Sequence, residues 1–289
     1  MVVSFSGTFL AIDWGTTNRR VFLVEGGQVV RTERDDRGVT SVSDFAAEAA
    51  GIRERFGDLP MLMAGMVGSN IGWQAAPYVP APAGVEDLAA NLLRIDARTA
   101  IVPGVSVTGP ADVMRGEEVQ LLGAVAAGLV PHDALLAQPG THCKWALMEG
   151  GRIAGFTTAM TGELFAMLRK YGLLSSQLTE EVTLGQAFLD GVEEGRKRDL
   201  AASLFGIRAA KLLGEREDTD AASFASGLLI GSDVAARLER VGHDTVHILA
   251  DPVLGGLYAA AIEVHGRRAV RVDSHAAFVA GIIAIGSIM

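Results

Sequence analysis

Two short glycine turns, each following an apolar run, have the composition of phosphate-binding loops. The first reads DWGTTN at residues 13–18, and the second reads GTH at residues 140–142. Backbone N–H groups and threonine hydroxyls in such turns can hold phosphate oxygens, and a carboxylate such as Asp13 can hold a magnesium ion, usually through water. A single Asp-x-Gly turn is equally typical of an ordinary hairpin. Two such turns together favour a nucleotide whose β- and γ-phosphates are gripped by both.

A pair of carboxylates lies between these turns, at the expected start of a helix. Glu117 and Glu118 follow Arg115 and Gly116. Phosphoryl transfer to an alcohol needs a carboxylate that accepts the hydroxyl proton, and we expect Glu117, or as second choice Glu118, to do so. The alternative is that both are only favourable charges at the positive end of the helix. No Gly-x-x-x-x-Gly-Lys-Ser/Thr signature is present, so a Walker-type site is not predicted.

The elements that would position these residues follow a repeated pattern. Apolar runs predict strands at 8–12, 21–24, 28–30 and 60–63, with a helix over 43–56 before the last of them. Residues 144–153, KWALMEGGRI, align without a gap on residues 20–29, RVFLVEGGQV, and a Gly-Thr turn precedes both copies. This repeat indicates a duplicated domain facing itself across a cleft, although a short apolar hairpin could also arise twice by chance.

Alternating elements in the last third of the chain indicate a second α/β lobe. The pattern predicts helices at 221–238 and 253–264, strands at 245–249 and 269–272, and a helix from residue 274 onward. We therefore expect an N-terminal domain over 1–112 and a C-terminal domain over 113–273, each with one phosphate loop. The C-terminal helix 274–289 is expected to pack back on the first domain.

The composition describes a compact globular protein with a small-molecule substrate. The chain has 289 residues, of which 49% are hydrophobic and 20% charged, and its net charge is −9. No run of Lys and Arg offers a nucleic-acid footprint, and the apolar C-terminal stretch of about 14 residues is too short to span a bilayer. The single cysteine, Cys143, excludes an intramolecular disulfide. Because no export signal is visible, we expect a cytoplasmic protein without nucleic-acid or membrane partners.

Five segments together resemble the 2-dehydro-3-deoxygalactonokinase family along nearly the whole chain. They are residues 11–18, 63–73, 113–118, 139–145 and 161–164, and they occur in the family order. The resemblance implies the actin, Hsp70 and sugar-kinase fold, an α/β fold with two ribonuclease-H-like domains facing a central cleft. It also implies the use of Mg²⁺ and ATP to phosphorylate 2-dehydro-3-deoxy-D-galactonate at O6 in galactonate breakdown.

Site residues follow from the motifs and from the resemblance. The expected contacts of the ATP phosphates are Gly15, Thr16, Thr17, Asn18, Gly140, Thr141, His142 and Lys144. The resemblance places the adenosine motif near residues 249–252, giving Ala250, Asp251 and Leu254, although the usual Gly-Gly pair is displaced to residues 255–256. A polar, glycine-rich edge with aromatic residues predicts the sugar-acid contacts Gly68, Ser69, Asn70, Trp73, Tyr78 and Arg115. Trp73 and Tyr78 could instead only pack their loop.

Two other functions remain open at this level. An ATP-driven switch related to actin or Hsp70 would share the fold but would need no acceptor pocket. A kinase for another sugar or keto-deoxy sugar acid would share fold and chemistry, since one fold hosts many substrates. The sequence leaves open the choice between the galacto acid and its gluco epimer, the preferred nucleotide and whether the protein forms a homo-oligomer.

Overall fold

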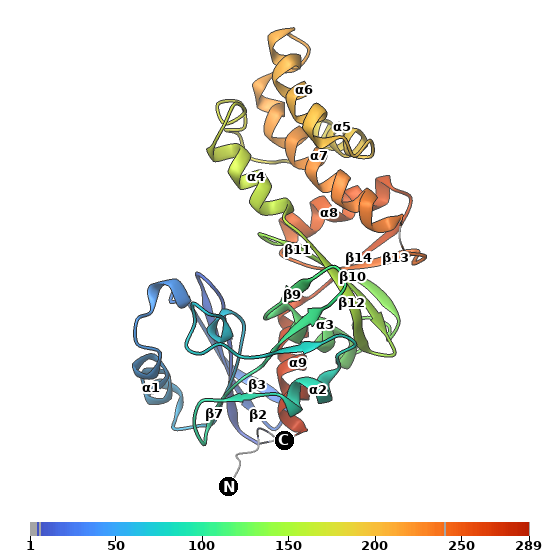
Figure 1. Cartoon of the computed structure of the whole chain (residues 1–289). Helices are drawn as coiled ribbons and strands as arrows, with labels where there is room; N and C mark the ends of the chain where they lie inside the picture. The colour runs from blue at the N-terminus through green and yellow to red at the C-terminus, as the bar shows by residue number, and fades with distance from the viewer. Residues whose placement is uncertain (1–4, 6, 240, 289) are drawn as a thin grey trace. The chain divides into compact units, whose positions relative to one another are not determined.

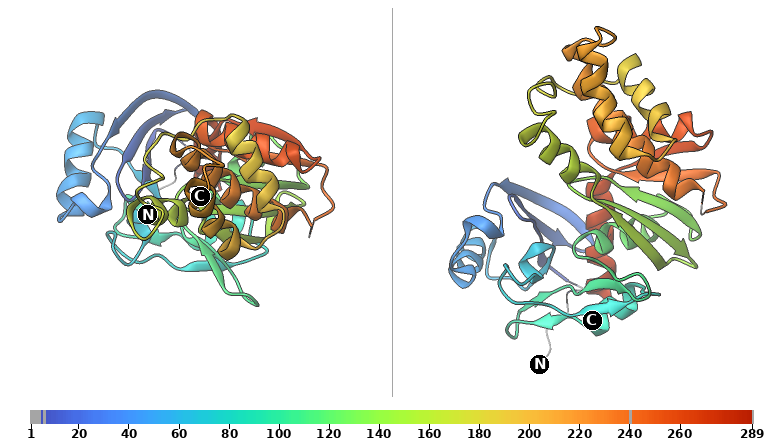
Figure 2. Two further views of the ribbon diagram at one scale, coloured as in Figure 1. Left: turned by 90° about the horizontal axis from the view of Figure 1, so that it is seen from above. Right: turned by 45° about the horizontal axis from the view of Figure 1, so that its top comes forward.

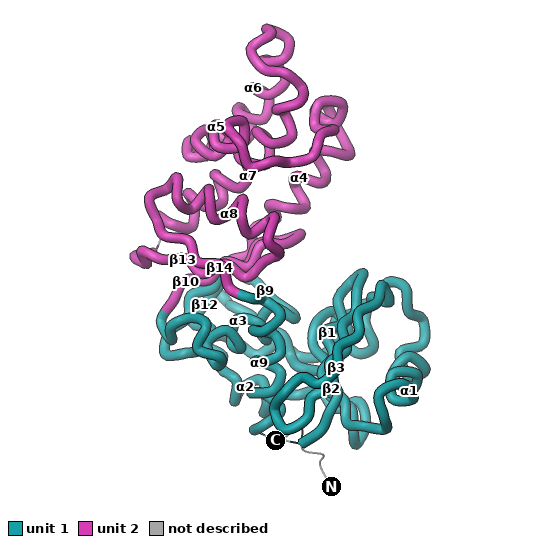
Figure 3. The backbone as a smooth tube through the Cα atoms, turned by 180° about the vertical axis from the view of Figure 1, so that it is seen from behind, with its two compact units in different colours: residues 1–133, 146–156, 273–289 teal, residues 134–145, 157–272 magenta. Residues whose placement is uncertain are grey.

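The computed structural model describes residues 5, 7–239 and 241–288, and it divides the chain into two compact units (Figures 1 and 3). Unit 1 comprises residues 1–133, 146–156 and 273–289, and unit 2 comprises residues 134–145 and 157–272. These bounds differ from the expected division between residues 112 and 113. Residues 113–133 belong to unit 1 because the helix within them packs along the C-terminal helix of the same unit.

Unit 1 is built on a six-stranded sheet with the order β3-β2-β1-β4-β7-β6. Its strands are β1 (Phe9–Trp14), β2 (Arg19–Glu25), β3 (Gln28–Asp35), β4 (Met61–Ala64), β6 (Leu93–Arg94) and β7 (Thr99–Ile101). A three-stranded sheet contains β5 (Tyr78–Pro80), β8 (Gly104–Val107) and β9 (Asp112–Met114). Strand β1 pairs antiparallel with β2 and parallel with β4, so the ends of β1 and β4 meet at one edge of the sheet.

Four helices complete unit 1: α1 (Phe45–Phe56), α2 (Val85–Ala90), α3 (Glu117–Ala126) and α9 (Ser274–Ser287). Helix α1 begins where Asp44 accepts the N–H of Ala47, and it buries Ala49, Ile52 and Phe56 at helical spacing. These residues pack in the same core cluster as the side chains of β1 and β4. The apolar core therefore fixes the strands whose ends carry the candidate residues.

Unit 2 contains the parallel strands β10 (Ala134–Gln138), β13 (Thr245–Leu249) and β14 (Arg268–Val272). Its helices are α4 (Thr161–Lys170), α5 (Gln186–Gly195), α6 (Leu200–Leu212), α7 (Asp218–Leu238) and α8 (Pro252–Val264). Helices α4 to α7 gather in one group, in which α5 runs beside α7 (Figure 2). Of these four, the sequence analysis predicted only α7. No helix in the described part of the chain is both long and apolar enough to cross a membrane.

The predicted duplication is confirmed by the strand order. Strands β11 (Cys143–Glu149) and β12 (Arg152–Ala159) complete the second sheet, whose order is β12-β11-β10-β13-β14. The first five strands of the other sheet follow the same order, β3-β2-β1-β4-β7. The bounds of β2 and β3 fall on those of β11 and β12 when shifted by the 124 residues that align the two hairpins.

Helices α3 and α9 approach each other so closely that only glycine fits at their contact. A Cβ atom on Gly123 would lie 1.9 Å from the carbonyl oxygen of Ala277, and one on Gly281 would lie 2.0 Å from that of Val119. Both distances are far inside van der Waals contact with backbone atoms, which cannot rotate away. The two glycines therefore set the position of the start of α3, where Glu117 and Glu118 lie.

We expect Gly281→Ala to lower the free energy of unfolding by about 2 kcal/mol or more, since the added methyl must push two helices apart. Urea-induced unfolding measures the change. The matched control is Gly206→Ala on α6, where a Cβ would meet nothing within 4 Å. That control should be neutral or gain up to about 1 kcal/mol from helix propensity. Equal effects of the two substitutions would contradict the close packing of α3 and α9.

Candidate active site

The carbonyl groups of the first glycine turn accept hydrogen bonds from residues 38–40. The carbonyl oxygen of Thr16 accepts the N–H and the hydroxyl of Thr40 at 3.2 and 2.9 Å, and that of Thr17 accepts the N–H of Gly38 at 3.3 Å. The side-chain amide of Asn18 donates to the Thr17 hydroxyl at 2.9 Å. Within the described residues, the N–H groups of Thr16 and Thr17 have no acceptor. The exposed turn can therefore donate both amides to an anion.

Asp13 stands at the base of this turn, which the N–H of Gly15 closes by donating to the carbonyl of Asn18 at 2.9 Å. Asp13 is the register partner of Arg20 on β2, and their side chains form an ion pair at 3.1 Å. Burial raises the pKa of the Asp13 carboxyl, and the positive groups of Arg20 and His275 oppose that rise.

The residues around Asp13 fit a magnesium ion that arrives with a nucleotide. No three His, Cys, Asp or Glu side chains in the described ranges converge as a set of metal ligands. Mg²⁺ usually binds through one or two carboxylates, with waters and substrate phosphates as its other ligands. A single carboxylate beside a phosphate loop is consistent with that coordination.

Two glycines bring the Arg-Gly-Glu-Glu segment against the first turn. Gly65, directly after β4, has φ 96°, and a Cβ there would lie 2.8 Å from the carbonyl oxygen of Trp14. Gly116 has φ 102°, and a Cβ there would lie 3.0 Å from the Cα of Gly65. A side chain at either position would strain the left-handed backbone and would clash with the neighbouring segment, so both positions favour glycine. Three segments remote in sequence therefore meet at the ends of β1 and β4.

The two glutamates at the start of α3 have different surroundings. Glu118 is fully buried, and both of its carboxyl oxygens accept the N–H of Gly116, at 2.7 and 2.8 Å. Burial, together with the neighbouring Glu117, raises the pKa of Glu118 to about 8. Glu117 is partly exposed, and one of its oxygens accepts the N–H of Arg115 at 3.0 Å. Glu118 is thus mostly protonated at neutral pH and supports the turn, whereas Glu117 can face a substrate.

The buried Glu118 should make the stability of the protein depend on pH. Its folded pKa of about 8 lies above the ordinary 4.5, so the folded state binds this proton more tightly than the unfolded state. The free energy of unfolding should therefore fall as pH rises from about 5 to above 8. Glu118→Gln, which mimics the protonated acid, should remove on the order of a few kcal/mol of that fall.

Urea unfolding at pH 5.5 and 8.5 measures the pH dependence of the free energy of unfolding for the wild type and for the variant. Glu54→Gln, on the exposed side of α1, should keep the wild-type slope, and an unchanged slope in Glu118→Gln would contradict the burial argument.

The predicted sugar-acid edge is only partly exposed. Asn70 and Tyr78 are exposed, whereas Gly68 and Ser69 are buried, and the Ser69 hydroxyl donates to the carbonyl of Met66 at 2.7 Å. The Ser69 side chain is therefore engaged in holding its own turn.

The two aromatic residues of this edge have separate surroundings. Trp73 is half-buried and stacks on Phe45, with ring centroids 6.3 Å apart and an interplanar angle of 13°. Its packing role, which the sequence left open, is therefore evident. Tyr78 lies beneath the Arg115 guanidinium, whose carbon is 4.3 Å from the ring centroid.

Two of the three side-chain nitrogens of Arg115 have no hydrogen-bond acceptor among the described residues. Its Nη2 donates to the carbonyl of Ala76 at 2.7 Å, whereas its buried Nε and Nη1 have no acceptor among the described residues. A Cβ on Gly68 would lie 3.0 Å from Nη1, so this glycine leaves room for the guanidinium. Unsatisfied buried donors are costly, and a bound anion is one way to satisfy them.

The start of helix α4 holds the second glycine turn. The N–H of Glu163 donates to the carbonyl of Thr141 at 2.8 Å, and the Glu163 carboxylate lies 2.6 Å from Nε2 of His142. A Cβ on Gly162 would lie 2.3 Å from the carbonyl oxygen of Gly140. Gly140, Thr141 and His142 are themselves exposed, as a phosphate-binding loop requires.

Lys144, the other predicted phosphate contact, lies in the interior. It is 5% exposed, and its Nζ donates to the Thr158 hydroxyl at 2.7 Å. The amine is thus engaged by the neighbouring strand β12. The first four residues of β11 are all buried, Cys143 and Trp145 among them, and nothing in the sequence distinguished Lys144 from its neighbours.

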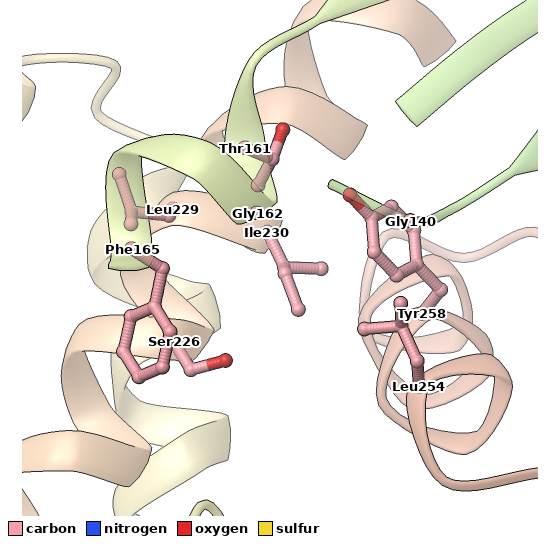
Figure 4. A pocket seen from close by; sticks show the side chains of 9 residues that line it. All are labelled: Gly140, Thr161, Gly162, Phe165, Ser226, Leu229, Ile230, Leu254 and Tyr258. Atoms are coloured by element: carbon pink, nitrogen blue, oxygen red, sulfur yellow. The ribbon is translucent and has the colours of Figure 1, made fainter. Parts of the chain in front are cut away.

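A pocket beside the second turn is lined by apolar side chains from three helices (Figure 4). It has a volume of about 60 Å³ and opens to solvent. Its lining residues are Gly140, Thr161, Gly162, Phe165, Ser226, Leu229, Ile230, Leu254 and Tyr258. Figure 4 shows Phe165 and Ser226 on one side of the space and Leu254 and Tyr258 on the other. Apolar walls with a few polar groups, next to an exposed glycine turn, have the general character of a small-molecule site.

The sequence-based adenosine prediction matches this pocket at one position. Leu254 lines it, whereas Ala250 and Asp251 are not among its lining residues. The Asp251 carboxylate caps α8 by accepting the N–H groups of Val253 and Leu254 at 3.0 and 3.1 Å. The aromatic and aliphatic walls from α4, α7 and α8 were missed, because ordinary core residues on distant helices carry no sequence motif.

Two sheets of the same strand order, with an exposed glycine turn after the first strand of each, define an α/β protein of the actin-like ATPase fold. An activator of a 2-hydroxyisocaproyl-CoA dehydratase from Clostridium difficile shares this fold, with a TM-score of 0.51 and 10% identity over 97% of this chain and 95% of that one. Residues 13–285 match the family described as 2-keto-3-deoxy-galactonokinase, and the chain belongs to that family.

Two relatives support this assignment along almost the full length. A 2-dehydro-3-deoxygalactonokinase from Escherichia coli K12 is 36% identical over 286 residues, which cover 96% of this chain and 97% of the relative. A solved structure from Sinorhizobium meliloti, named for the same activity, is 33% identical with a TM-score of 0.90 and covers 96% and 97% of the two chains. The chain is a carbohydrate kinase by family, as the five sequence segments predicted.

Proposed function

We propose that the protein transfers the γ-phosphate of Mg-ATP to O6 of 2-dehydro-3-deoxy-D-galactonate, as a step of galactonate breakdown in the cytoplasm. The observation that carries the proposal is the 36% identity to a 2-dehydro-3-deoxygalactonokinase across 96% of this chain. A cytoplasmic location agrees with the free, buried Cys143, because thiols stay reduced there.

In unit 2, the nucleotide would use the apolar pocket and the adjacent Gly140 turn, with adenosine against the walls formed by Leu229, Leu254 and Tyr258. In unit 1, the unpaired amides of Thr16 and Thr17 are the donors that would bind phosphate oxygens. Bound Mg²⁺ would neutralise charge on the phosphates, and Asp13 is the residue that would hold it.

Glu117 would accept the proton of the acceptor hydroxyl. Its carboxylate is partly exposed and is oriented by the N–H of Arg115 at 3.0 Å. The O–H bond breaks as the new O–P bond forms, the proton passes to Glu117, and ADP leaves with the electrons of the broken O–P bond. Glu118 suits this role less, because its carboxyl is fully buried, accepts the N–H of Gly116, and burial raises its pKa.

Arg115 is the proposed contact of the substrate carboxylate. Its guanidinium lies flat over Tyr78 and has two buried donor nitrogens without an acceptor in the described residues. Arginine donors suit carboxylates, and a charge-assisted hydrogen bond is stronger than a neutral one. With a net charge of −9, the protein as a whole repels an anionic substrate, so a local cation matters.

An ADP-release assay tests the proposal directly. Purified protein is incubated with Mg-ATP and, separately, 2-dehydro-3-deoxygalactonate, its gluco epimer, galactonate, glucose or no acceptor. Strong turnover with the galacto keto-deoxy acid alone is the expected result, and a phosphorus NMR spectrum of the product should place the phosphate on O6. Turnover with glucose, or ATP hydrolysis without an acceptor, would replace the proposed substrate by another sugar or by no acceptor at all.

A further inference from the structure

A nearly buried carboxylate in unit 2 takes no part in the proposed chemistry. Asp233 on α7 is 8% exposed. Its Oδ2 accepts three hydrogen bonds: from Nε1 of Trp145 at 3.0 Å, from the hydroxyl of Thr161 at 3.2 Å and from the hydroxyl of Tyr258 at 3.3 Å. One oxygen atom thus connects three elements that are remote in sequence.

Each of these donors belongs to a part of the proposed nucleotide site. Trp145 lies on β11, three residues after the His142 turn. Thr161 is the first residue of α4, whose next two residues pack on that turn and donate to it. Tyr258 lines the nucleoside pocket, and so does Ile230, one turn before Asp233 on α7. The strand after the second turn, the start of α4 and the Tyr258 side of the pocket are therefore all hydrogen-bonded to Asp233.

The charge of Asp233 explains why one residue can hold three elements. A buried carboxylate is costly unless donors surround it, so moving any of the three donors away carries a penalty. Arg237 completes the surroundings, with its Nε 3.7 Å from Oδ1, and the Cys143 thiol lies close enough to interact. A carboxamide would replace one acceptor oxygen by an NH₂ group directed at Arg237, and its remaining oxygen carries no negative charge, so the hydrogen bonds it accepts are weaker.

We propose that Asp233 is a positioning residue for nucleotide binding, which fixes the Gly140–His142 turn and the Tyr258 wall of the pocket in a single arrangement. The inference rests on the proposed function in taking the nucleotide to be ATP. It assigns no contact between Asp233 and the nucleotide, because the carboxylate acts through Thr161, Trp145 and Tyr258.

Binding of MgADP to Asp233→Asn, measured by calorimetry without any acceptor, tests the proposal. We expect the Kd to rise on the order of 10- to 100-fold, the scale of losing a hydrogen bond to a charged group. In the assay with acceptor, the KM for ATP should rise similarly, while the KM for the sugar acid changes less than about twofold. Ser203→Ala is the matched control, since it removes a buried hydrogen bond to the Glu194 carboxylate within the same unit and lines no part of the nucleoside pocket.

Thr161→Val provides a second test of the proposal if Asp233→Asn folds poorly. This change removes one donor with little change of shape and should raise the Kd for MgADP several-fold. In the double variant the two effects should add only in part, because Thr161 lines the pocket but also donates to Asp233, so the two changes share one hydrogen bond. Additive effects, equal rises of both KM values, or an unchanged Kd in both single variants would overturn the proposal.

The two proposals fail separately. If the wild-type protein binds MgADP but phosphorylates no keto-deoxy acid, the proposed substrate is wrong. The inference about Asp233 is still tested in that case, because it depends only on the Kd for MgADP. If the wild type is an active kinase and Asp233→Asn binds MgADP as tightly as it does, only the inference about Asp233 is lost.

Discussion

Replacing Glu117 by Gln should lower kcat by roughly 100-fold or more while leaving both KM values within about threefold. The amide keeps the size of the side chain, and its carbonyl oxygen can still accept the N–H of Arg115 that now holds the carboxylate. Only the capacity to take a proton is lost. The effect therefore belongs to the transition state and not to substrate binding.

Two further variants identify which glutamate is the base. Glu117→Asp retains a carboxylate set back by one methylene group, so it should recover part of the lost kcat. Glu118→Gln should change the pH dependence of stability much more than it changes kcat, because it copies the protonated state that burial already favours. A drop in kcat for Glu118→Gln that matches or exceeds the drop for Glu117→Gln would exchange the two assignments.

The second large effect is expected for Asp13→Asn. Loss of the carboxylate should lower kcat about 100-fold at a fixed low Mg²⁺ concentration, since a metal ion supplies several kcal/mol of charge stabilisation in such reactions. The concentration of Mg²⁺ that gives half-maximal rate should rise at the same time. Titrating Mg²⁺ at saturating ATP and sugar acid measures both changes.

The ion pair between Asp13 and Arg20 provides the control for this prediction. Arg20→Gln removes the pair but keeps the carboxylate, so the half-maximal Mg²⁺ concentration should stay the same or fall. Binding of the sugar acid should be unaffected in Asp13→Asn. An Asp13→Asn protein with wild-type metal dependence would exclude Asp13 from the metal site, and equal defects in both variants would assign a structural role to the ion pair.

Local sequence was sufficient for most of the strand framework. The hairpin β2–β3 and its copy β11–β12 were predicted from ten aligned residues, since an apolar run followed by Glu-Gly-Gly is a local signal for a hairpin. Helices α8 and α9 were predicted to within one or two residues at their starts. The helices α5 and α6 were not predicted. In α5 the side facing α7 includes Gly191 and Gly195, so tight packing replaces part of the apolar stripe that marks other helices.

The sequence alone therefore determined those features that depend only on the residue types within a short segment. The two glycine turns, the Glu117–Glu118 pair and the family membership all come from contiguous residues, because the motifs are local. Tertiary structure decided which groups are buried and which meet. It separated the partly exposed Glu117 from the buried Glu118, placed the Lys144 amine in the interior and stacked Trp73 on Phe45. It also formed the apolar pocket beside the second turn and hydrogen-bonded Asp233 to two of its lining residues, Thr161 and Tyr258. Burial and the meeting of distant helices depend on the packing of the whole chain, so no single segment carries a signal for them.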